Sequence, residues 1–340
     1  APVAGTPAQA VARLGAMQAQ DDGAVRWAIG LRCAGATAAT VEQALATGGV
    51  VRTWLLRGTL HVVAAADVRW MLALLAPRIL AGSRGRHRQL GLDDGTLAHS
   101  LGVIGAALEG DALLTRTELL ALLEQAGIAT TGQRGYYLLA HAALRGLICF
   151  GARQEKQERF MLLAARAPAA AELDPDAALG KLALRYFTGH GPATLADFVW
   201  WSGLTLGQAR TALAVAGAEM EQISTGDHVY YHVPAAASES STDASGVHLL
   251  PAFDEYYLGY AQRDLVLAAG LDKRVVSSNG IFHPMIVVDG RIVGTWRSVR
   301  KGQSVRIQPE LFDALDSAGE VALYEAMQRF ATFLGATLIA

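Results

Sequence analysis

The sequence has very few of the residues that build disulfide scaffolds and zinc sites. Cys33 and Cys149 are the only cysteines among its 340 residues. They stand far apart, in apolar surroundings and without metal-ligand spacing, which indicates buried thiols in a reducing compartment. Gly-rich phosphate loops, nucleophile elbows and zinc signatures are also missing. The chain therefore lacks the common motifs of nucleotide-dependent, serine-dependent and zinc-dependent enzymes.

Long apolar runs and targeting segments are missing too. No apolar run reaches the roughly 18 residues that a membrane-spanning helix needs. The first ten residues, APVAGTPAQA, lack the charged start and apolar core of a signal peptide, and they lack an initial Met, which indicates a trimmed chain. The length of 340 residues predicts two to four compact units, and 52% hydrophobic with 18% charged residues predicts sizeable cores. We expect a cytoplasmic protein without a membrane partner.

Excess positive charge is also missing, which counts against a typical nucleic-acid binder. The 29 basic and 31 acidic residues leave a formal charge of −2. Basic side chains nevertheless gather in two segments without any acid, 77–91 and 290–308. Among others, these segments contain Arg84, Arg86 and Arg88, and Arg297, Arg300 and Lys301. Solvated loops and patches that face phosphates are both open interpretations.

Hydrophobic spacing predicts three helices and then a strand pair at the start of the chain. Apolar residues recur at helical spacing before Met17, and Asp21 or Asp22 can cap the second helix. The segment 50–63 is rich in β-branched and aromatic residues, which favours strands. Three helices followed by a strand pair is the order of a winged helix. The pattern helix–helix–hairpin recurs twice more along the chain.

Changes in composition divide the chain into an α+β arrangement of several domains. An Ala/Pro-rich linker follows the second unit, and short β-branched runs around an Asp-Gly turn follow the third. We predict winged helices at 1–78, 79–166 and 179–236, a linker at 167–178, and a β-rich domain at 245–340.

Two glutamines, Gln18 and Gln20, flank one small apolar residue between the first two predicted helices. If this connector is extended, residues two apart face the same side and offer both amides to one object. Paired amides can hold a water, a base edge or a sugar oxygen, whereas the alternative is a solvent-facing loop. Asp21 follows directly; it is a natural helix cap and also the nearest carboxylate able to act as a base.

Polar residues alternate along the segment LRGTLHVV. Arg57, Thr59 and His61 would share one face of a strand. Arginine suits a phosphate, and histidine suits a phosphate or a stacked base. An ordinary exposed strand face is an equal alternative.

Acidic and aromatic residues crowd together in PAFDEYYLGYAQRD. A carboxylate pair such as Asp254 and Glu255 can indicate hydrolysis or a metal site, but no His stands nearby at metal-ligand spacing. We therefore interpret this segment as a structural Asp–Arg–Tyr network.

Six motifs in order resemble the AlkZ-like winged-helix DNA glycosylase family. They are GAMQAQD, RWAIGLR, LRGTLHVV, WWSGLT, LLPAFDEYYLGY and GIFHPMIVVDGRIVGTW, and they cover nearly the whole chain. The resemblance implies tandem winged helices with a C-terminal β-barrel-like domain, C-shaped around a DNA channel. The family usually begins with a further basic helix that is missing here, so the first unit is expected to be incomplete.

The resemblance also implies an activity. The family's catalytic Gln-apolar-Gln motif matches Gln18, Ala19 and Gln20. One branch has Asp at the second motif position, so Gln20 places this chain with the resistance-type branch. Members excise bulky N7-alkylated purines, including natural-product adducts and some interstrand crosslinks, without a metal. We therefore expect a monofunctional, cofactor-free and monomeric glycosylase that repairs alkylated double-stranded DNA at the bacterial nucleoid, or confers self-resistance.

The chemistry of such a lesion explains why two amides would suffice. An N7-alkylated guanine is already cationic and leaves readily, so no acid has to protonate it. Two amide oxygens can hold a water beneath C1′ without ionising. The competing hypothesis is a non-enzymatic winged-helix protein that regulates genes or binds drug adducts. Gln18 and Gln20 separate the two hypotheses, because a regulator has no need for both.

Overall fold

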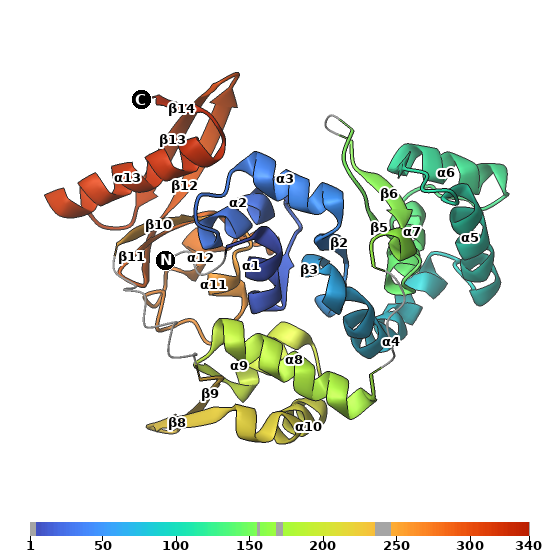
Figure 1. Cartoon of the computed structure of the whole chain (residues 1–340), viewed down its shortest axis with the longest axis horizontal. Coiled ribbons are helices and arrows are strands. Elements are labelled where there is room, and N and C mark those ends of the chain that lie inside the picture. The colour runs from blue at the N-terminus through green and yellow to red at the C-terminus, as the bar shows by residue number, and fades with distance from the viewer. Residues whose placement is uncertain (1–4, 155–156, 168–172, 235–245, 340) are drawn as a thin grey trace.

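A computed structural model describes residues 5–154, 157–167, 173–234 and 246–339. Its elements form three units with one order: a helix, a short strand, two helices and a β-hairpin. In each unit the first strand pairs with the last, which gives a three-stranded sheet. A fourth, β-rich unit closes the chain. Figure 1 shows the first unit at the centre, the second to its right, the third below it and the fourth to its left.

The first unit places its sheet beside three capped helices. Thr6, Asp21 and Thr37 cap its helices by accepting backbone N–H bonds, which explains where each helix begins. The sheet order is β1-β3-β2, and strand β1 was not predicted from the sequence. Its elements are α1 (Pro7–Leu14), β1 (Ala16–Gln18), α2 (Asp22–Arg32), α3 (Ala38–Thr47), β2 (Val50–Trp54), the 3-10 turn η1 (Leu56–Gly58) and β3 (Leu60–Ala64).

A long helix, α4 (Ala65–Gln89), links the first unit to the second. The boundary predicted at residue 78 lies inside this helix, and the basic segment 77–91 is mostly helical rather than a loop. No helix in the described parts of the chain, α4 included, is long and apolar enough to cross a membrane. The second unit contains α5 (Asp94–Ala107), β4 (Leu114–Thr115), α6 (Arg116–Gln125), α7 (Arg134–Leu144), β5 (Ile148–Phe150), β6 (Arg159–Leu162) and η2 (Leu163–Ala165).

The third unit begins with α8 at Pro175, inside the predicted linker 167–178. Residues 168–172 of that linker lie outside the described residues. The unit contains α8 (Pro175–His190), β7 (Ala193–Thr194), α9 (Leu195–Ser202), α10 (Leu206–Ala216), η3 (Gly217–Glu219), β8 (Glu221–Thr225) and β9 (His228–His232).

The C-terminal unit is an open, curled half-barrel with the strand order β10-β11-β12-β13-β14. The predicted hairpin turn is present between β11 and β12, where Asp289 and Gly290 both have positive φ, as a tight hairpin turn requires. The elements are β10 (Val247–Leu250), α11 (Glu255–Leu258), α12 (Asp272–Val275), β11 (Met285–Val288), β12 (Arg291–Lys301), β13 (Ser304–Leu311), α13 (Ser317–Phe333) and β14 (Thr337–Ile339).

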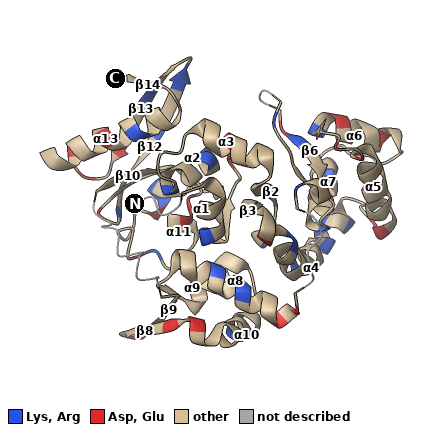
Figure 2. Ribbon diagram, in the orientation of Figure 1, with Lys and Arg blue, Asp and Glu red and all other residues tan. Residues whose placement is uncertain are grey.

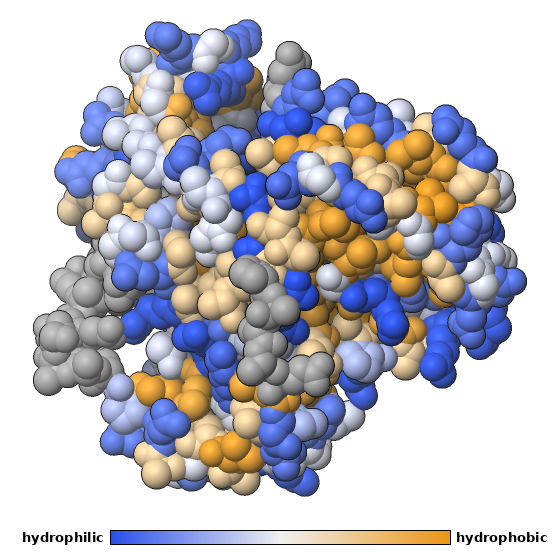
Figure 3. Space-filling view, turned by 45° about the vertical axis from the view of Figure 1, so that its right-hand side comes forward, coloured by the Kyte–Doolittle hydropathy of each residue, from blue (hydrophilic) through white to orange (hydrophobic). Residues whose placement is uncertain are grey.

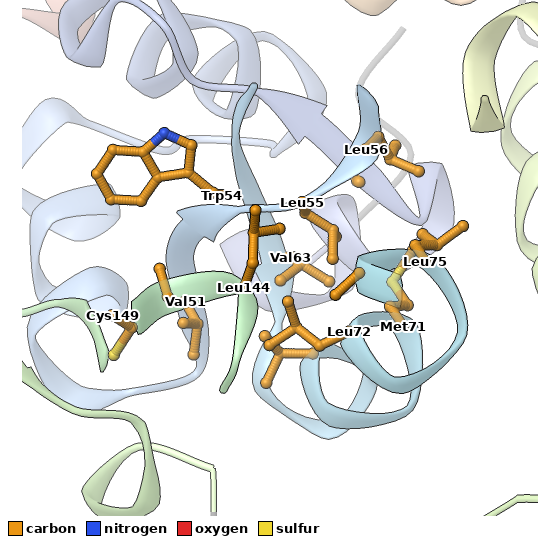
Figure 4. Packing of buried hydrophobic residues seen from close by; sticks show 14 of the residues in the cluster. Val51, Trp54, Leu55, Leu56, Val63, Met71, Leu72, Leu75, Leu144 and Cys149 are labelled. Atoms are coloured by element: carbon orange, nitrogen blue, oxygen red, sulfur yellow. The ribbon is translucent and has the colours of Figure 1, made fainter. Parts of the chain in front are cut away.

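The first unit shares a hydrophobic core with each of its neighbours. Figure 4 shows Trp54 and Val63 of its sheet beside Leu72 of α4 and Leu144 of the second unit. On its other side, Trp27 of α2 contacts two phenylalanine rings of α13 at centroid distances of 5.1 and 5.0 Å. Burial of these large rings holds the first unit in a fixed position between the other units.

Candidate active site

The glutamine pair lies where strand β1 ends and the chain continues extended toward α2. Gln18 is the last residue of β1 and pairs with His61 across the sheet. Ala19 is fully buried, whereas Gln18 is half-buried and Gln20 is exposed. This alternation is what an extended connector predicts, because residues two apart face the same side. Both amides therefore lie on the side away from the buried methyl group.

Three separate elements hold the backbone of the pair. The Ala19 N–H donates to the Leu60 carbonyl at 2.7 Å. The Ala19 carbonyl accepts two bonds from the buried Arg52 guanidinium, from Nε at 3.2 Å and from Nη2 at 3.0 Å. The Gln18 N–H donates to Oε1 of Glu255 at 2.9 Å. The short segment is thus preorganised by contacts that reach from β2, β3 and α11.

Donor-only neighbours fix the orientation of both amide groups. Oε1 of Gln18 accepts from Nη2 of Arg57 at 3.3 Å, and Oε1 of Gln20 accepts from the Leu60 N–H at 3.4 Å. A guanidinium and a backbone N–H cannot accept, so each amide must present its oxygen to them. Each amide oxygen keeps a second lone pair. Gln20 has the weaker partner and the greater exposure, so its oxygen is the freer acceptor.

A buried polar network lies behind Gln18. Glu255 is 2% exposed, and its Oε2 accepts from Nε1 of Trp201 at 3.0 Å and lies 3.3 Å from Nε2 of His190. Nδ1 of His190 lies 3.2 Å from the Tyr186 carbonyl. Both ring nitrogens of His190 therefore lie close to oxygen atoms, one of Glu255 and one of the Tyr186 backbone.

The network keeps Glu255 ionised. Burial raises the pKa of this carboxyl, but the hydrogen bond and charge of His190, and the N–H of Gln18, lower the pKa by more. The net pKa of Glu255 lies below its usual range. The carboxylate consequently stays charged at neutral pH and remains a strong acceptor for the N–H of Gln18.

His61 lies beside this network as a neutral ring. It is fully buried, its Nδ1 lies 3.0 Å from the Thr59 carbonyl, and its Nε2 has no partner among the described residues. Burial, followed by the charge of Arg57, lowers the pKa of His61 to about 4. The unfolded chain therefore takes up a proton below about pH 6.5 that the folded chain takes up only near pH 4, so stability falls through that window as the pH drops.

Comparisons with known proteins show the family of the chain. A family model described as "DNA glycosylase AlkZ-like" matches residues 11–333. The chain belongs to the AlkZ-like DNA glycosylase family. The glycosylase is 28% identical over 306 residues to the "Interstrand DNA cross-link repair glycosylase" of Streptomyces sahachiroi, a match that covers 85% of this chain and 81% of that protein.

A solved structure shares the fold of the glycosylase. It is the Streptomyces sahachiroi DNA glycosylase AlkZ, with a TM-score of 0.80 and 23% sequence identity over 98% of this chain and 93% of that chain. Family membership makes the protein a DNA repair enzyme. It decides against the competing hypothesis of a non-enzymatic DNA-binding protein.

The predicted polar strand face is only partly present in the glycosylase. Arg57 lies in the turn η1 with a φ of 56°, not on β3. Its guanidinium donates to the Trp201 carbonyl and to Gln18. Thr59 precedes β3 and bonds back to the turn, and His61 alone belongs to the strand, where it is buried. The prediction of one face was wrong because Gly58 and Arg57 both adopt positive φ, which turns the chain before the strand begins.

Asp21 takes the helix-cap position. Its Oδ1 accepts from the Ala24 N–H at 2.8 Å at the start of α2. Asp22 instead forms ion pairs with Arg26 and Arg153. The cap explains why α2 begins here, and it leaves catalysis by Asp21 a hypothesis to be tested.

The two basic segments lie on different units. Arg84 and Arg88 are exposed near the end of α4, and Arg86 between them bonds to Gln89 and Gln133. The second segment runs along β12 to the hairpin with β13, where its basic side chains are exposed. Figure 2 shows blue residues in both regions, at the right centre and the upper left. The exposed basic residues of β12 are Arg291, Arg297, Arg300 and Lys301.

Sequence reasoning missed three residues that build the site: Arg52, His190 and Trp201. It also placed Glu255 only in a general structural network. Its neighbour Asp254 forms a two-bond ion pair at 2.9 and 2.7 Å with Arg32, which lies outside the segment in which the network was predicted. The available signal was the motifs WWSGLT and LLPAFDEYYLGY, which contain Trp201 and Glu255.

Proposed function

We propose that the glycosylase hydrolyses the N-glycosidic bond of bulky, cationic N7-alkylated purines in double-stranded DNA. The observation that carries the proposal is the preorganised Gln18–Ala19–Gln20 segment, whose backbone is held by Leu60, Arg52 and Glu255. Neutral amides cannot protonate a leaving base. They therefore suit a base that already carries positive charge.

The two glutamines divide the work. Gln18 is oriented by Arg57, and Gln20 presents the freer oxygen at the exposed end of the pair. A water held by both oxygens would lie beneath C1′ of the lesion, positioned for attack as the base departs. Because the water is already held in position, the reaction does not have to order it in the transition state, and the entropic part of the activation barrier is lower. The sugar then needs only neutral acceptors around it while positive charge develops.

In this proposal the three helix-and-hairpin units act as winged helices around the duplex, and together with the C-terminal unit they supply the DNA contacts. Arg84, Arg86 and Arg88 on α4 would contact phosphates on one side of the site. Arg297, Arg300 and Lys301 on β12 would contact phosphates on the other side. The related Streptomyces sahachiroi enzyme is named for interstrand cross-link repair, which supports a bulky lesion as the substrate.

The test is release of base from oligonucleotides that contain N7-alkylguanine, scored as abasic sites after subtracting spontaneous loss. We expect wild-type protein to release the base, and Gln18→Ala with Gln20→Ala together to slow release by roughly 10²–10³-fold, the range for losing preorganised hydrogen-bonding groups. Gln9→Ala, on α1 of the same unit, is the matched control and should retain activity. Melting temperatures should stay close to wild type.

Two outcomes would contradict the proposal. Full activity in the double variant would show that the glutamines do not position the water. Absence of base release by wild-type protein from every N7-alkylguanine substrate would show that the lesion class is wrong.

A further inference from the structure

A large cavity lies between the first, second and third units. It has a volume of about 450 Å³ and is walled by α4, α7, the turn η1 and the residues that follow α9. Ligand pockets commonly have volumes of ~300–1,000 Å³. Figure 3 shows apolar residues gathered on the right of the face that this view brings forward, with hydrophilic residues around them. The cavity is large enough for a fused aromatic ring system.

The cavity begins one side chain away from the catalytic pair. Arg57 lines it, and the same guanidinium donates to Oε1 of Gln18 and to the Trp201 carbonyl. Gly203, on the opposite wall, lies so close that a Cβ there would be 3.3 Å from Cγ of Arg57. The cavity and the glutamine pair therefore lie on two sides of one arginine, and one lesion could reach both.

The lining favours a neutral aromatic group. Tyr136 and Tyr137 offer rings, and α4 offers leucine and isoleucine side chains. Among the residues that the structure describes, no acidic side chain lines the cavity, and the formal charges of the lining, on Arg57 and Arg78, are both positive. A cationic group would thus be repelled, whereas a planar group rich in electrons can stack on a guanidinium.

Two histidines add hydrogen-bonding capacity without charge. Burial lowers the pKa of His87, and burial, the charge of His87 and the charge of Arg145 lower the pKa of His141 to about 4. The two rings lie 5.9 Å apart. Nδ1 of His141 is buried and has no partner among the described residues. Neutral imidazoles of this kind can bond to a carbonyl or hydroxyl group on a ligand.

We propose that this cavity binds the neutral, planar aromatic arm of the adduct, while the cationic purine to which the arm is attached stays at Gln18 and Gln20. The inference rests on the proposed function and names the part of the lesion that the enzyme selects. The positive lining explains the division, because it excludes the cationic base and admits the uncharged arm. Lesions with a large aromatic arm should consequently be processed faster than lesions with a methyl group.

The experiment compares two oligonucleotides, one with N7-methylguanine and one with N7-(naphthylmethyl)guanine, at subsaturating enzyme. Gly82→Phe fills the cavity, because a Cβ at Gly82 meets no atom within 4 Å and the residue lies inside helix α4. Ser83→Phe is a second filling variant, and Ala81→Phe is the control, because Ala81 is exposed on the same helix and does not line the cavity. Melting temperatures check folding.

We expect wild-type protein to prefer the naphthylmethyl lesion and the filling variants to lower that preference, expressed as a ratio of rates, by roughly tenfold, which corresponds to about 1.4 kcal/mol. The control should keep the wild-type ratio. Wild-type ratios in both folded filling variants would overturn the inference.

Naphthyl fluorescence provides a readout that does not need base release. Its emission should shift when the arm enters the cavity of the wild-type protein and should shift less in the filling variants. A fluorescence response without base release would reject the proposed function and retain the pocket. Base release that the filling variants leave unchanged, both in rate and in emission, would reject the pocket and retain the proposed function.

Discussion

The first unit and its two repeats treat the end of their first strand differently. In the second unit, the N–H of Thr115 donates to Glu118 at 2.7 Å, and in the third, the N–H of Thr194 donates to Asp197 at 2.9 Å. Both are capping boxes, so a helix starts directly after the strand. In the first unit the equivalent N–H, of Gln18, donates to a carboxylate 237 residues away.

This difference explains how the first unit makes room for an extended segment between its strand and its helix. Once a distant carboxylate satisfies the strand's last N–H, the local sequence no longer has to start a helix at that point. Three residues, 19–21, then separate β1 from α2, and they provide the extended stretch that carries Gln20. The segment that we propose to be catalytic is therefore an elongated strand-to-helix junction, and the carboxylate that accepts from its strand lies in another unit.

The largest effect is expected from removing Glu255, the distant carboxylate that accepts from Gln18. Removing Glu118, the local carboxylate of the second unit, is the matched comparison. Glu255→Ala leaves the buried His190, the Trp201 N–H and the Gln18 N–H without their acceptor. Leaving a buried donor without its acceptor costs about 1–3 kcal/mol for each group. We expect this loss in urea unfolding, together with loss of base release per folded molecule. Glu118→Ala removes an exposed cap of the second unit and should cost less stability while retaining base release.

Glu255→Gln separates position from charge. The amide oxygen can still accept from Gln18, so base release should recover partly relative to Glu255→Ala. Glu255→Ala could instead lower stability and leave the rate of base release by the folded fraction intact. Glu255 would then have only a structural role, and its bond to Gln18 would not matter for base release.

The next test separates binding from chemistry by neutralising each basic segment. Changing Arg84, Arg86 and Arg88 to Gln should weaken DNA binding and reduce the slope of log K against log salt by roughly 0.9 per lost phosphate contact. The rate at saturating protein should hold, because the glutamine pair lies on another element. Arg297, Arg300 and Lys301 provide the parallel set on β12. A set that leaves the slope unaltered faces away from DNA.

Local patterns predicted helix caps and hairpin turns, but they did not predict the contacts between units. Helix caps and hairpin turns depend on residues within four positions, so Thr115 with Glu118 and Asp289 with Gly290 were predictable. The glutamine pair was found through its spacing and through a resemblance. The contact of Gln18 with Glu255, by contrast, joins residues far apart in sequence, and no local propensity records it.

Two further features were not predicted, for related reasons: the turn before β3, and the hydrogen bonds from Arg52 to the Ala19 carbonyl. Alternation of polar residues through Arg57 and His61 looked like a strand, but positive φ at Arg57 breaks that period. Arg52 is buried within a strand and meets Ala19 only because β1 and β2 flank β3. Both depend on the assembled sheet rather than on neighbouring residues.

The smallest expected effect concerns Asp21, the residue that ends the elongated junction. An ionisable base leaves a titration step in the single-turnover rate, whereas two neutral amides leave none. On a permanently cationic N7-alkylguanine, the wild-type rate should stay nearly flat from mildly acidic to neutral pH after subtracting spontaneous depurination. Asp21→Asn should keep most activity, because Asn caps a helix about as well as Asp and can still accept from Ala24. A rate that rises with pH like a carboxylate titration, and that loses both the rise and the activity in Asp21→Asn, would make Asp21 the base and leave the glutamines to orient the water.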